Sequence, residues 1–422
     1  MKRRIKGKFQ FRKPNSAKDR KYISYEDAPL REVEQLDPTP DNLTKKFLKV
    51  FLILFIAVVA VLAIVNIDYL TPENISHWFQ YDLLGKTEGN GYPVRIVGTS
   101  INKENIALMD NNLLYCSDTS VVVLNSNAGE IQNNQHSMAN PVLRSSSGYS
   151  VIYNSEAPGF KIISPDSIVY SGNMKNKIFS ADIVQNGTYA ILTYGEDYLS
   201  VLDVFKYDNS KKYTYSFADY YVNNVSLNKD GTGAVLSGVS AKNGGMISVI
   251  YILDFRQENY LQKYEVEDSY IYDIKYMNNG NVLAVGSRSA YFINVEEGSK
   301  KNITYDSRTL TTYTFKRDYG LILSLSKNPD GRDCDIVSVT ADGKDGLNIV
   351  TANKVLSMDY KGDSLAVLFP GEIVIYDRDQ NRKSSVTVAS DSRKICMQSE
   401  NDIYALGKSE IAKFHPVREK QN

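Results

Sequence analysis

Residues 271–285 read IYDIKYMNNGNVLAV, and this stretch decides the fold. Apolar residues stand at its first, fourth and sixth positions, a turn follows at Gly280, and an uninterrupted apolar run follows the turn. The pattern predicts two short β-strands joined as a hairpin. A third short apolar run at 292–294 ends in Asn294 and predicts one more strand of the same sheet.

The same unit recurs along the chain. Its clearest copies begin 44, 49, 39 and 45 residues apart, at Ile178, Val222, Ile271, Leu310 and Val355. Weaker copies at 106–124, 149–153 and 403–411 bring the number of units to about eight. A period of roughly 40–45 residues built from strands is typical of a β-propeller. Radial stacking in that fold covers both faces of each small sheet.

We therefore predict an all-β fold, a β-propeller of seven or eight blades with WD40-like or quinoprotein-like repeats, over residues 94–417. The weak first and last copies leave the blade number open, and the chain near Val94 is expected to complete the last sheet. The alternative is a pair of β-sandwiches with accidental spacing. The Trp-Asp signature of WD40 repeats is absent from the sequence, because the single Trp lies outside the repeats.

A long apolar stretch precedes the repeats. Residues 50–65 are apolar without a break, and with its flanks the segment covers 47–67. As a helix it would span roughly 31 Å, about the hydrocarbon thickness of a bilayer. We predict one transmembrane helix, against the alternatives of a cleaved signal peptide and a buried core helix. The residues expected to anchor it are Val50, Phe51, Leu52, Phe55, Val58, Leu62 and Val65.

The charge of the chain is distributed unevenly about this segment. The whole chain is neutral, with 49 basic and 49 acidic residues, but residues 1–49 hold 14 basic against 7 acidic ones. Positive charges next to a membrane segment favour the cytoplasmic side. Lys45, Lys46 and Lys49 therefore predict a cytoplasmic N-terminus and a C-terminal domain outside the cell membrane.

Two further segments flank the predicted membrane helix. Residues 1–46 are polar, basic and poor in large aliphatic side chains, which predicts a disordered cytoplasmic tail. Residues 68–93 are expected to form a juxtamembrane helix and a Gly-rich linker. Trp78 and Phe79 would lie at the outer membrane interface, or the helix would pack against the folded domain as a stalk.

This layout resembles a known family. The basic tail, the single apolar segment, the linker that runs into GYPVRIVG at 91–98 and the Tyr-rich repeats are similar to a family of propeller-like, single-pass membrane-anchored proteins of Gram-positive anaerobic bacteria. The resemblance covers most of the chain from about residue 45. It implies the propeller fold and an extracytoplasmic domain. It implies no ligand, because the family carries no assigned activity.

The sequence predicts no catalytic, metal-binding or cofactor-binding set of residues. Its histidines, His77, His136 and His415, share no motif, and it contains no phosphate loop or nucleophile elbow. Its three cysteines are too few for a disulfide framework and are expected to be isolated, half-buried residues. We therefore expect a protein that is not an enzyme.

The tyrosines at the starts of two repeats are candidate recognition residues, namely Tyr220, Tyr221, Tyr270 and Tyr272. Tyrosine is common on adaptable binding surfaces, although it also simply suits strands. We expect a binding or scaffold module at the cell envelope, next to the lipid bilayer, which holds a protein partner or a cell-wall glycan and no nucleic acid. The alternative is an extracytoplasmic carbohydrate-active hydrolase or lyase that uses carboxylates in the propeller funnel.

Overall fold

The structure is a computed structural model, and it describes residues 49–54 and 89–418. The chain divides into two compact units, Met1–Val65 and Asn66–Asn422. In the first unit, residues 49–54 are helical and their apolar side chains are exposed. Neither described range contains a helix with the length and apolar character needed to cross a membrane.

Most of the residues predicted for the membrane region lie outside the described ranges. Val50, Phe51, Leu52 and Lys49 belong to the helical segment 49–54. The other predicted anchor, topology and interfacial residues are outside the described residues: Phe55, Val58, Leu62, Val65, Lys45, Lys46, Trp78 and Phe79. Their roles stay predictions.

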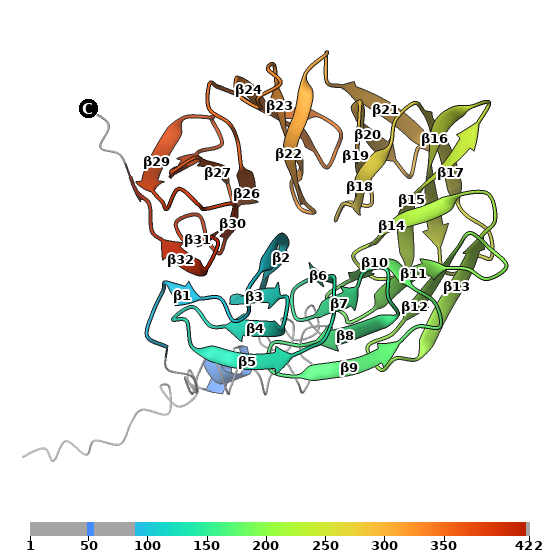
Figure 1. Ribbon diagram of the computed structural model, residues 1–422, viewed down its shortest axis with the longest axis horizontal. Coiled ribbons are helices and arrows are strands. Elements are labelled where there is room, and N and C mark those ends of the chain that lie inside the picture. The colour runs from blue at the N-terminus through green and yellow to red at the C-terminus, as the bar shows by residue number, and fades with distance from the viewer. Residues whose placement is uncertain (1–48, 55–88, 419–422) are drawn as a thin grey trace, which may run out of the picture. The chain divides into compact units, whose positions relative to one another are not determined.

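The second unit is an all-β propeller of eight blades around a central axis (Figure 1). Blade 1 comprises β2 (Ile101–Met109), β3 (Asn112–Ser117), β4 (Ser120–Leu124) and β5 (Glu130–Gln135), and blade 2 comprises β6 (Pro141–Ser145), β7 (Ser150–Asn154), β8 (Gly159–Ile163) and β9 (Ile168–Asn173). Blade 3 comprises β10 (Ile178–Ile183), β11 (Tyr189–Tyr194), β12 (Ser200–Phe205) and β13 (Lys211–Phe217), and blade 4 comprises β14 (Tyr221–Leu227), β15 (Gly233–Lys242), β16 (Gly245–Asp254) and β17 (Gln262–Glu267).

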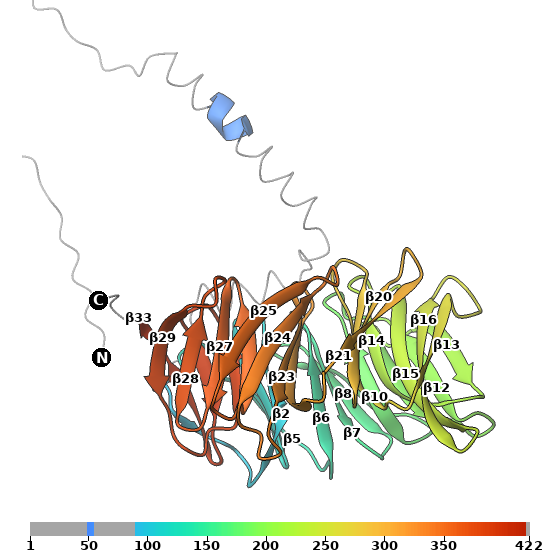
Figure 2. The ribbon, with the colours of Figure 1, turned by 90° about the horizontal axis from the view of Figure 1, so that it is seen from above.

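The other four blades continue the ring. Blade 5 comprises β18 (Ile271–Tyr276), β19 (Val282–Gly286), β20 (Ser289–Asn294) and β21 (Ser299–Thr304), and blade 6 comprises β22 (Thr309–Lys316), β23 (Gly320–Ser326), β24 (Cys334–Thr340) and β25 (Asp345–Thr351). Blade 7 comprises β26 (Ser357–Lys361), β27 (Ser364–Phe369), β28 (Glu372–Tyr376), β29 (Arg382–Thr387) and β33 (Val417–Arg418). Blade 8 comprises β30 (Lys394–Met397), β31 (Ile403–Leu406), β32 (Glu410–Phe414) and β1 (Val94–Arg95). In side view the strands run across the thickness of the ring (Figure 2).

The two ends of the propeller segment close the ring. β1 is the outermost strand of blade 8, where Val94 lies opposite Ile411 on β32. This pairing confirms that the chain near Val94 completes the last sheet. β33 adds a fifth strand to the outer edge of blade 7 by pairing with β29. Eight separate sheets exclude the β-sandwich alternative. The short strands β1 and β33 also pair with the edges of β32 and β29, which would otherwise stay unpaired.

Eight hydrophobic clusters hold the blades together, one between each pair of neighbours. In the cluster between blades 4 and 5, Ile271, Ile274 and Tyr276 of β18 pack against Val235 and Ile252 of the preceding blade. The three apolar positions that define each repeat therefore face the previous blade. A single four-stranded sheet could not bury both faces, so each blade depends on its neighbours for its core.

A β-bulge explains the spacing of this apolar pattern. In a regular strand, residues three apart point to opposite faces, yet Ile271 and Ile274 are both buried in one cluster. The register of β18 with β19 shifts between Ile271 and Asp273, so Tyr272 is an extra residue that restores the phase. The inner strands β10, β14 and β22 carry register shifts at the corresponding place.

Candidate functional site

The inner strands of neighbouring blades run in the same direction, which gives the ring two distinct ends. Near the starts of β14 and β18, Asn223 donates a hydrogen bond to the Tyr270 hydroxyl at 2.6 Å. Near the ends of β10 and β14, the backbone N–H of Leu227 donates to Asp182 at 2.8 Å. We call the end where the inner strands begin the mouth, and the end where they finish the base.

A cavity of about 710 Å³ lies on the central axis. Six of the eight inner strands line it: β2, β6, β18, β22, β26 and β30. Its charged lining comprises five cations and three carboxylates, namely Lys103, Arg144, Lys275, Lys316 and Lys394 with Glu104, Asp273 and Asp359. This volume lies within the range of sites that bind small molecules. We call it the central cavity.

Each carboxylate of the central cavity is paired with a lysine. Glu104 accepts from Lys394 at 2.6 Å, which joins blades 1 and 8, and Asp273 lies 3.3 Å from Lys275 within blade 5. Asp359 accepts from Lys316 at 2.5 Å, which joins blades 6 and 7. Burial alone would lower the pKa of Lys316, but the charge and hydrogen bond of Asp359 raise it, so the lysine stays protonated.

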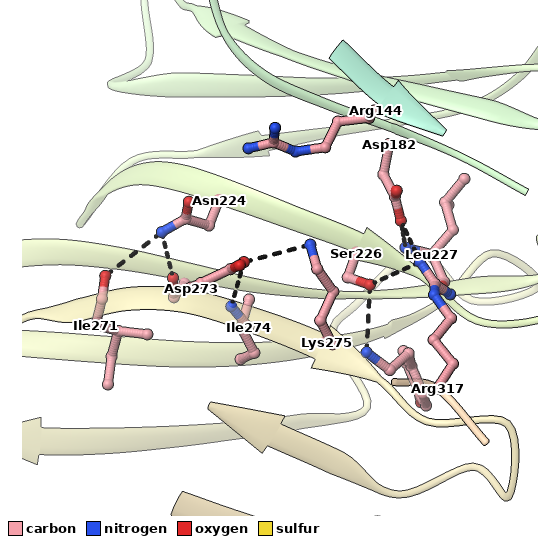
Figure 3. A network of polar contacts seen from close by, with 12 residues as sticks. Arg144, Asp182, Asn224, Ser226, Leu227, Ile271, Asp273, Ile274, Lys275 and Arg317 are labelled. Atoms are coloured by element: carbon pink, nitrogen blue, oxygen red, sulfur yellow. Dashed lines mark hydrogen bonds and ion pairs between the residues drawn. The ribbon is translucent and has the colours of Figure 1, made fainter. Parts of the chain in front are cut away.

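Arg144 on β6 has no carboxylate partner within the described part of the chain. Its guanidinium makes one hydrogen bond, from Nη1 to the Leu143 carbonyl at 3.0 Å. Figure 3 shows the guanidinium standing apart from Asp182 and from the Asp273–Lys275 pair. Burial lowers the pKa of Arg144. The nearby Tyr153 and the carboxylates of Asp273, Asp182 and Glu104 together have the larger, opposite effect, so the pKa is raised overall and the group is cationic.

Arg317 crosses the base of the ring. It follows β22 of blade 6, yet its guanidinium donates to Asp182 on blade 3 at 2.8 Å and to the Leu227 carbonyl on blade 4 at 2.6 Å (Figure 3). A third hydrogen bond, at 3.2 Å, reaches the Ser226 hydroxyl. Arg317 therefore ties three blades together at the base, and it is absent from the lining of the central cavity.

Tyrosines gather at the mouth on blades 3 to 5. About half of the surface of Tyr198, Tyr221 and Tyr272 is exposed, at 49%, 49% and 48%. The Tyr270 and Tyr272 rings lie 5.7 Å apart, and Tyr272 also lines the central cavity. Burial, a hydrogen bond to Glu156 and the nearby Tyr221 raise the pKa of Tyr194. We call Tyr194, Tyr198, Tyr221, Tyr270 and Tyr272 the tyrosine rim.

The structure places the four tyrosines singled out in the sequence in different environments. Tyr221 and Tyr272 are exposed, and Tyr270 is half-buried and held by Asn223. Tyr220 is buried, and burial together with the hydrogen bond from its hydroxyl to Glu265 raises its pKa to about 12. Tyr220 lies in the bend before β14 and packs in the hydrophobic cluster between blades 3 and 4, whereas Tyr221, the first residue of β14, is exposed.

One cysteine meets a histidine. Cys116 Sγ lies 3.4 Å from His136 Nε2, a pair that the sequence spacing did not predict. All three cysteines are free and buried, more deeply than predicted. Burial raises the pKa of the Cys116 thiol to about 12 and lowers that of His136. The thiolate is the nucleophilic form of cysteine, so this pair lacks the protonation state and the access that nucleophilic catalysis needs.

The acidic loop at 330–333 forms an ordinary turn. In the loop at 330–333, Asp330 accepts hydrogen bonds from the backbone and side chain of Arg332, so its carboxylate caps its own turn. In the described ranges, no group of three or more His, Cys, Asp or Glu side chains is placed to hold a metal ion.

The sequence analysis did not single out the charged residues of the central cavity. One signal in the repeats could have located Asp359 among them. A polar residue stands between the second and third apolar positions of the repeat, as at Asp182, Ser226 and Asp359. Each of these side chains accepts a hydrogen bond from a backbone N–H of the next blade: Leu227 at 2.8 Å, Tyr276 at 3.2 Å and Met397 at 2.7 Å. Arg144 and Arg317 follow no such repeat.

Solved structures of low sequence identity share this fold. BamB from Moraxella catarrhalis is 12% identical with a TM-score of 0.50, and the match covers 77% of this chain and 99% of that one. The C-terminal WD40 domain of Sif2 is also 12% identical, with a TM-score of 0.53, over 77% of this chain and 98% of that domain. Both define the class of protein as a β-propeller. No curated protein matches the sequence.

The particular family follows from the sequence of the propeller. Residues 90–415 match the sequence model of the family DUF5711, a family of unknown function. That range covers almost the whole ring, from just before β1 to just after β32. The chain therefore belongs to the DUF5711 family.

Proposed function

We propose that this protein is a membrane-anchored, non-catalytic binding module, whose propeller holds a partner protein or a wall polymer outside the cell membrane. The observation that carries the proposal is the tyrosine rim. It presents three half-exposed aromatic side chains at one end of a rigid ring. Large amphipathic side chains with few rotatable bonds supply contact area at low entropic cost.

The rim is fixed by contacts within and between blades. Asn223 of blade 4 holds the Tyr270 hydroxyl of blade 5, and the edge-to-face contact of Tyr270 fixes the ring of Tyr272. Phe179 of β10 packs on Tyr194, with ring centroids 3.8 Å apart. An ordered surface loses less conformational entropy when it binds a partner. These contacts favour the interpretation that the rim is a recognition surface over the alternative that its tyrosines merely suit strands.

The carboxylates of the central cavity favour binding over hydrolysis. Glycoside hydrolysis typically needs two carboxyl groups, one of them a proton donor with a raised pKa. Glu104, Asp273 and Asp359 each lie within ion-pair distance of a different lysine. All three carboxylates are thus engaged by cations of the protein itself, so we place the carbohydrate-active enzyme second.

We expect the loss of two rim aromatics to abolish capture of the partner. In full-length protein carrying Tyr221→Ala and Tyr272→Ala, in-cell crosslinking with mass spectrometry should recover at least tenfold less of a defined partner. Two truncated aromatic contacts each weaken binding by roughly 1–2 kcal/mol. If the ligand is a wall polymer, the same variant should pellet less with purified cell wall while no protein is crosslinked.

Tyr207→Ala is the matched control for the rim. Tyr207 is 59% exposed, and it lies in the turn after β12, at the base of the ring. This variant should capture the partner as well as the unchanged protein does. Equal capture by the Tyr221→Ala, Tyr272→Ala variant and the unchanged protein would refute a role of the rim in recognition.

The proposed topology predicts which introduced cysteines a membrane-impermeant maleimide can reach on intact cells. The native cysteines give little background, because all three are buried and burial raises the pKa of Cys116 and of Cys396 to about 12. Lys300→Cys, at an exposed position of the propeller, should be labelled at once. Ser16→Cys, in the basic tail, should be labelled only after the cells are permeabilised. The reverse pattern would contradict an external propeller.

A further inference from the structure

We propose that the central cavity binds a small ligand that carries a carboxylate or a phosphate group, with Arg144 as its anchor. The inference does not depend on the proposed function, although Tyr272 belongs to both the tyrosine rim and the cavity lining. It comes from the charge balance of the cavity and from the free donors around Arg144.

The charge balance of the central cavity is positive. Its lining holds five cations and three carboxylates, and the three ion pairs use one lysine for each carboxylate. Lys103 and Arg144 remain without an acidic partner among the described residues. The Arg317–Asp182 pair at the base adds one charge of each sign and leaves the excess at two. An anionic ligand would neutralise this excess.

The guanidinium of Arg144 is suited to this task. It is half-buried in the wall of the cavity, and only Nη1 donates a hydrogen bond, to the neighbouring Leu143 carbonyl. The remaining N–H groups find no acceptor in the described part of the chain. A guanidinium presents a planar fork of donors that matches the two oxygens of a carboxylate or phosphate. These donors remain available to a ligand, so an oxyanion here would satisfy several of them at once.

Further donors line the same space. Thr312 and Tyr313 of β22 are in the cavity lining, and neither hydroxyl makes a hydrogen bond to another described residue. Tyr313 is close enough to Arg144 for the guanidinium to influence its pKa, which burial raises. These hydroxyls could bind the uncharged part of a ligand held at Arg144.

The mouth sets the entry route of the ligand, and the volume of the cavity sets its size. Tyr272 is half-exposed at the mouth and lines the cavity, so the mouth is the entry. The volume of about 710 Å³ admits a small molecule or the tip of a flexible chain, and a folded partner would be too wide.

Isothermal titration calorimetry on the purified full-length protein tests the proposal. The probes are inorganic phosphate and succinate, titrated separately at an ionic strength held constant with sodium chloride. We expect saturable binding of at least one probe, and which of the two binds more tightly distinguishes a phosphate ligand from a carboxylate ligand. Arg144→Gln should weaken that binding at least tenfold. Lys103→Gln, at an exposed position, should weaken it by a smaller factor.

Controls separate binding from folding. Arg256→Gln removes a cation that is 83% exposed outside the cavity and should leave the affinity unchanged. If Arg144→Gln fails to fold, Arg144→Lys keeps the charge without the fork and should still weaken binding several-fold. The proposal is overturned if neither probe binds the unchanged protein saturably. It is also overturned if folded Arg144→Gln and Arg144→Lys bind as well as the unchanged protein, which would make Arg144 a purely structural counter-charge.

Discussion

Asp182→Ala should destabilise the propeller by about 3–5 kcal/mol, the cost of removing one partner of a buried ion pair. The Asp182 carboxylate is 5% exposed and accepts two hydrogen bonds of 2.8 Å, from the backbone of Leu227 and from Arg317. Without it, the buried N–H of Leu227 loses its acceptor and the Arg317 guanidinium loses one of its three. Denaturation of the full-length chain, followed by circular dichroism, should show a lower midpoint at an unchanged slope.

Two comparisons establish that the effect belongs to this contact. Asp182→Asn keeps an acceptor for Leu227 and removes the charge, so its midpoint should lie between those of Asp182→Ala and the unchanged protein. Glu196→Ala removes an exposed ion pair of similar length, with Lys175 at 2.7 Å, and should leave the midpoint unchanged. Equal midpoints for Asp182→Ala and Glu196→Ala would show that the base contact contributes nothing to stability.

The fold could be predicted because the apolar residues that hold the blades together form a short pattern that recurs along the sequence. Each blade buries three apolar residues of its inner strand against the previous blade, and those residues recur in every clear repeat, as at Ile271, Ile274 and Tyr276. The blade number could not be predicted because the closing elements are short. β1 has two residues and β30 has four, too few for a strand pattern to be visible in the sequence.

The candidate sites were much less accessible to sequence reasoning. Tyr220 and Tyr221 look equivalent in the sequence, yet the first packs in the cluster between blades 3 and 4 and the second is exposed at the start of β14. Tyr272 reaches the cavity because it is the extra residue of a bulge. Arg317 and Asp182 are 135 residues apart and meet only across the closed ring. Contacts of this kind depend on how many blades close the circle, which no local pattern encodes.

Gly320→Ala should destabilise the propeller by about 2–4 kcal/mol, through strain and overpacking. Gly320 begins β23 with φ of 146°, a backbone region that favours glycine. A Cβ there would lie 2.1 Å from the Val339 carbonyl oxygen of the neighbouring strand β24. Because that atom is backbone in the middle of blade 6, it cannot move aside without breaking the pairing of β23 with β24.

Gly280→Ala is the matched comparison, because each glycine lies where the inner strand of its blade connects to the second strand. Gly280 also has a positive φ, 88°, but a Cβ there meets no atom within 4 Å. Its substitution should therefore cost only the left-handed backbone conformation, about 1 kcal/mol. Thermal denaturation of the two variants should separate them clearly. Equal losses of stability would show that backbone conformation, and not the contact with β24, decides the cost at both turns.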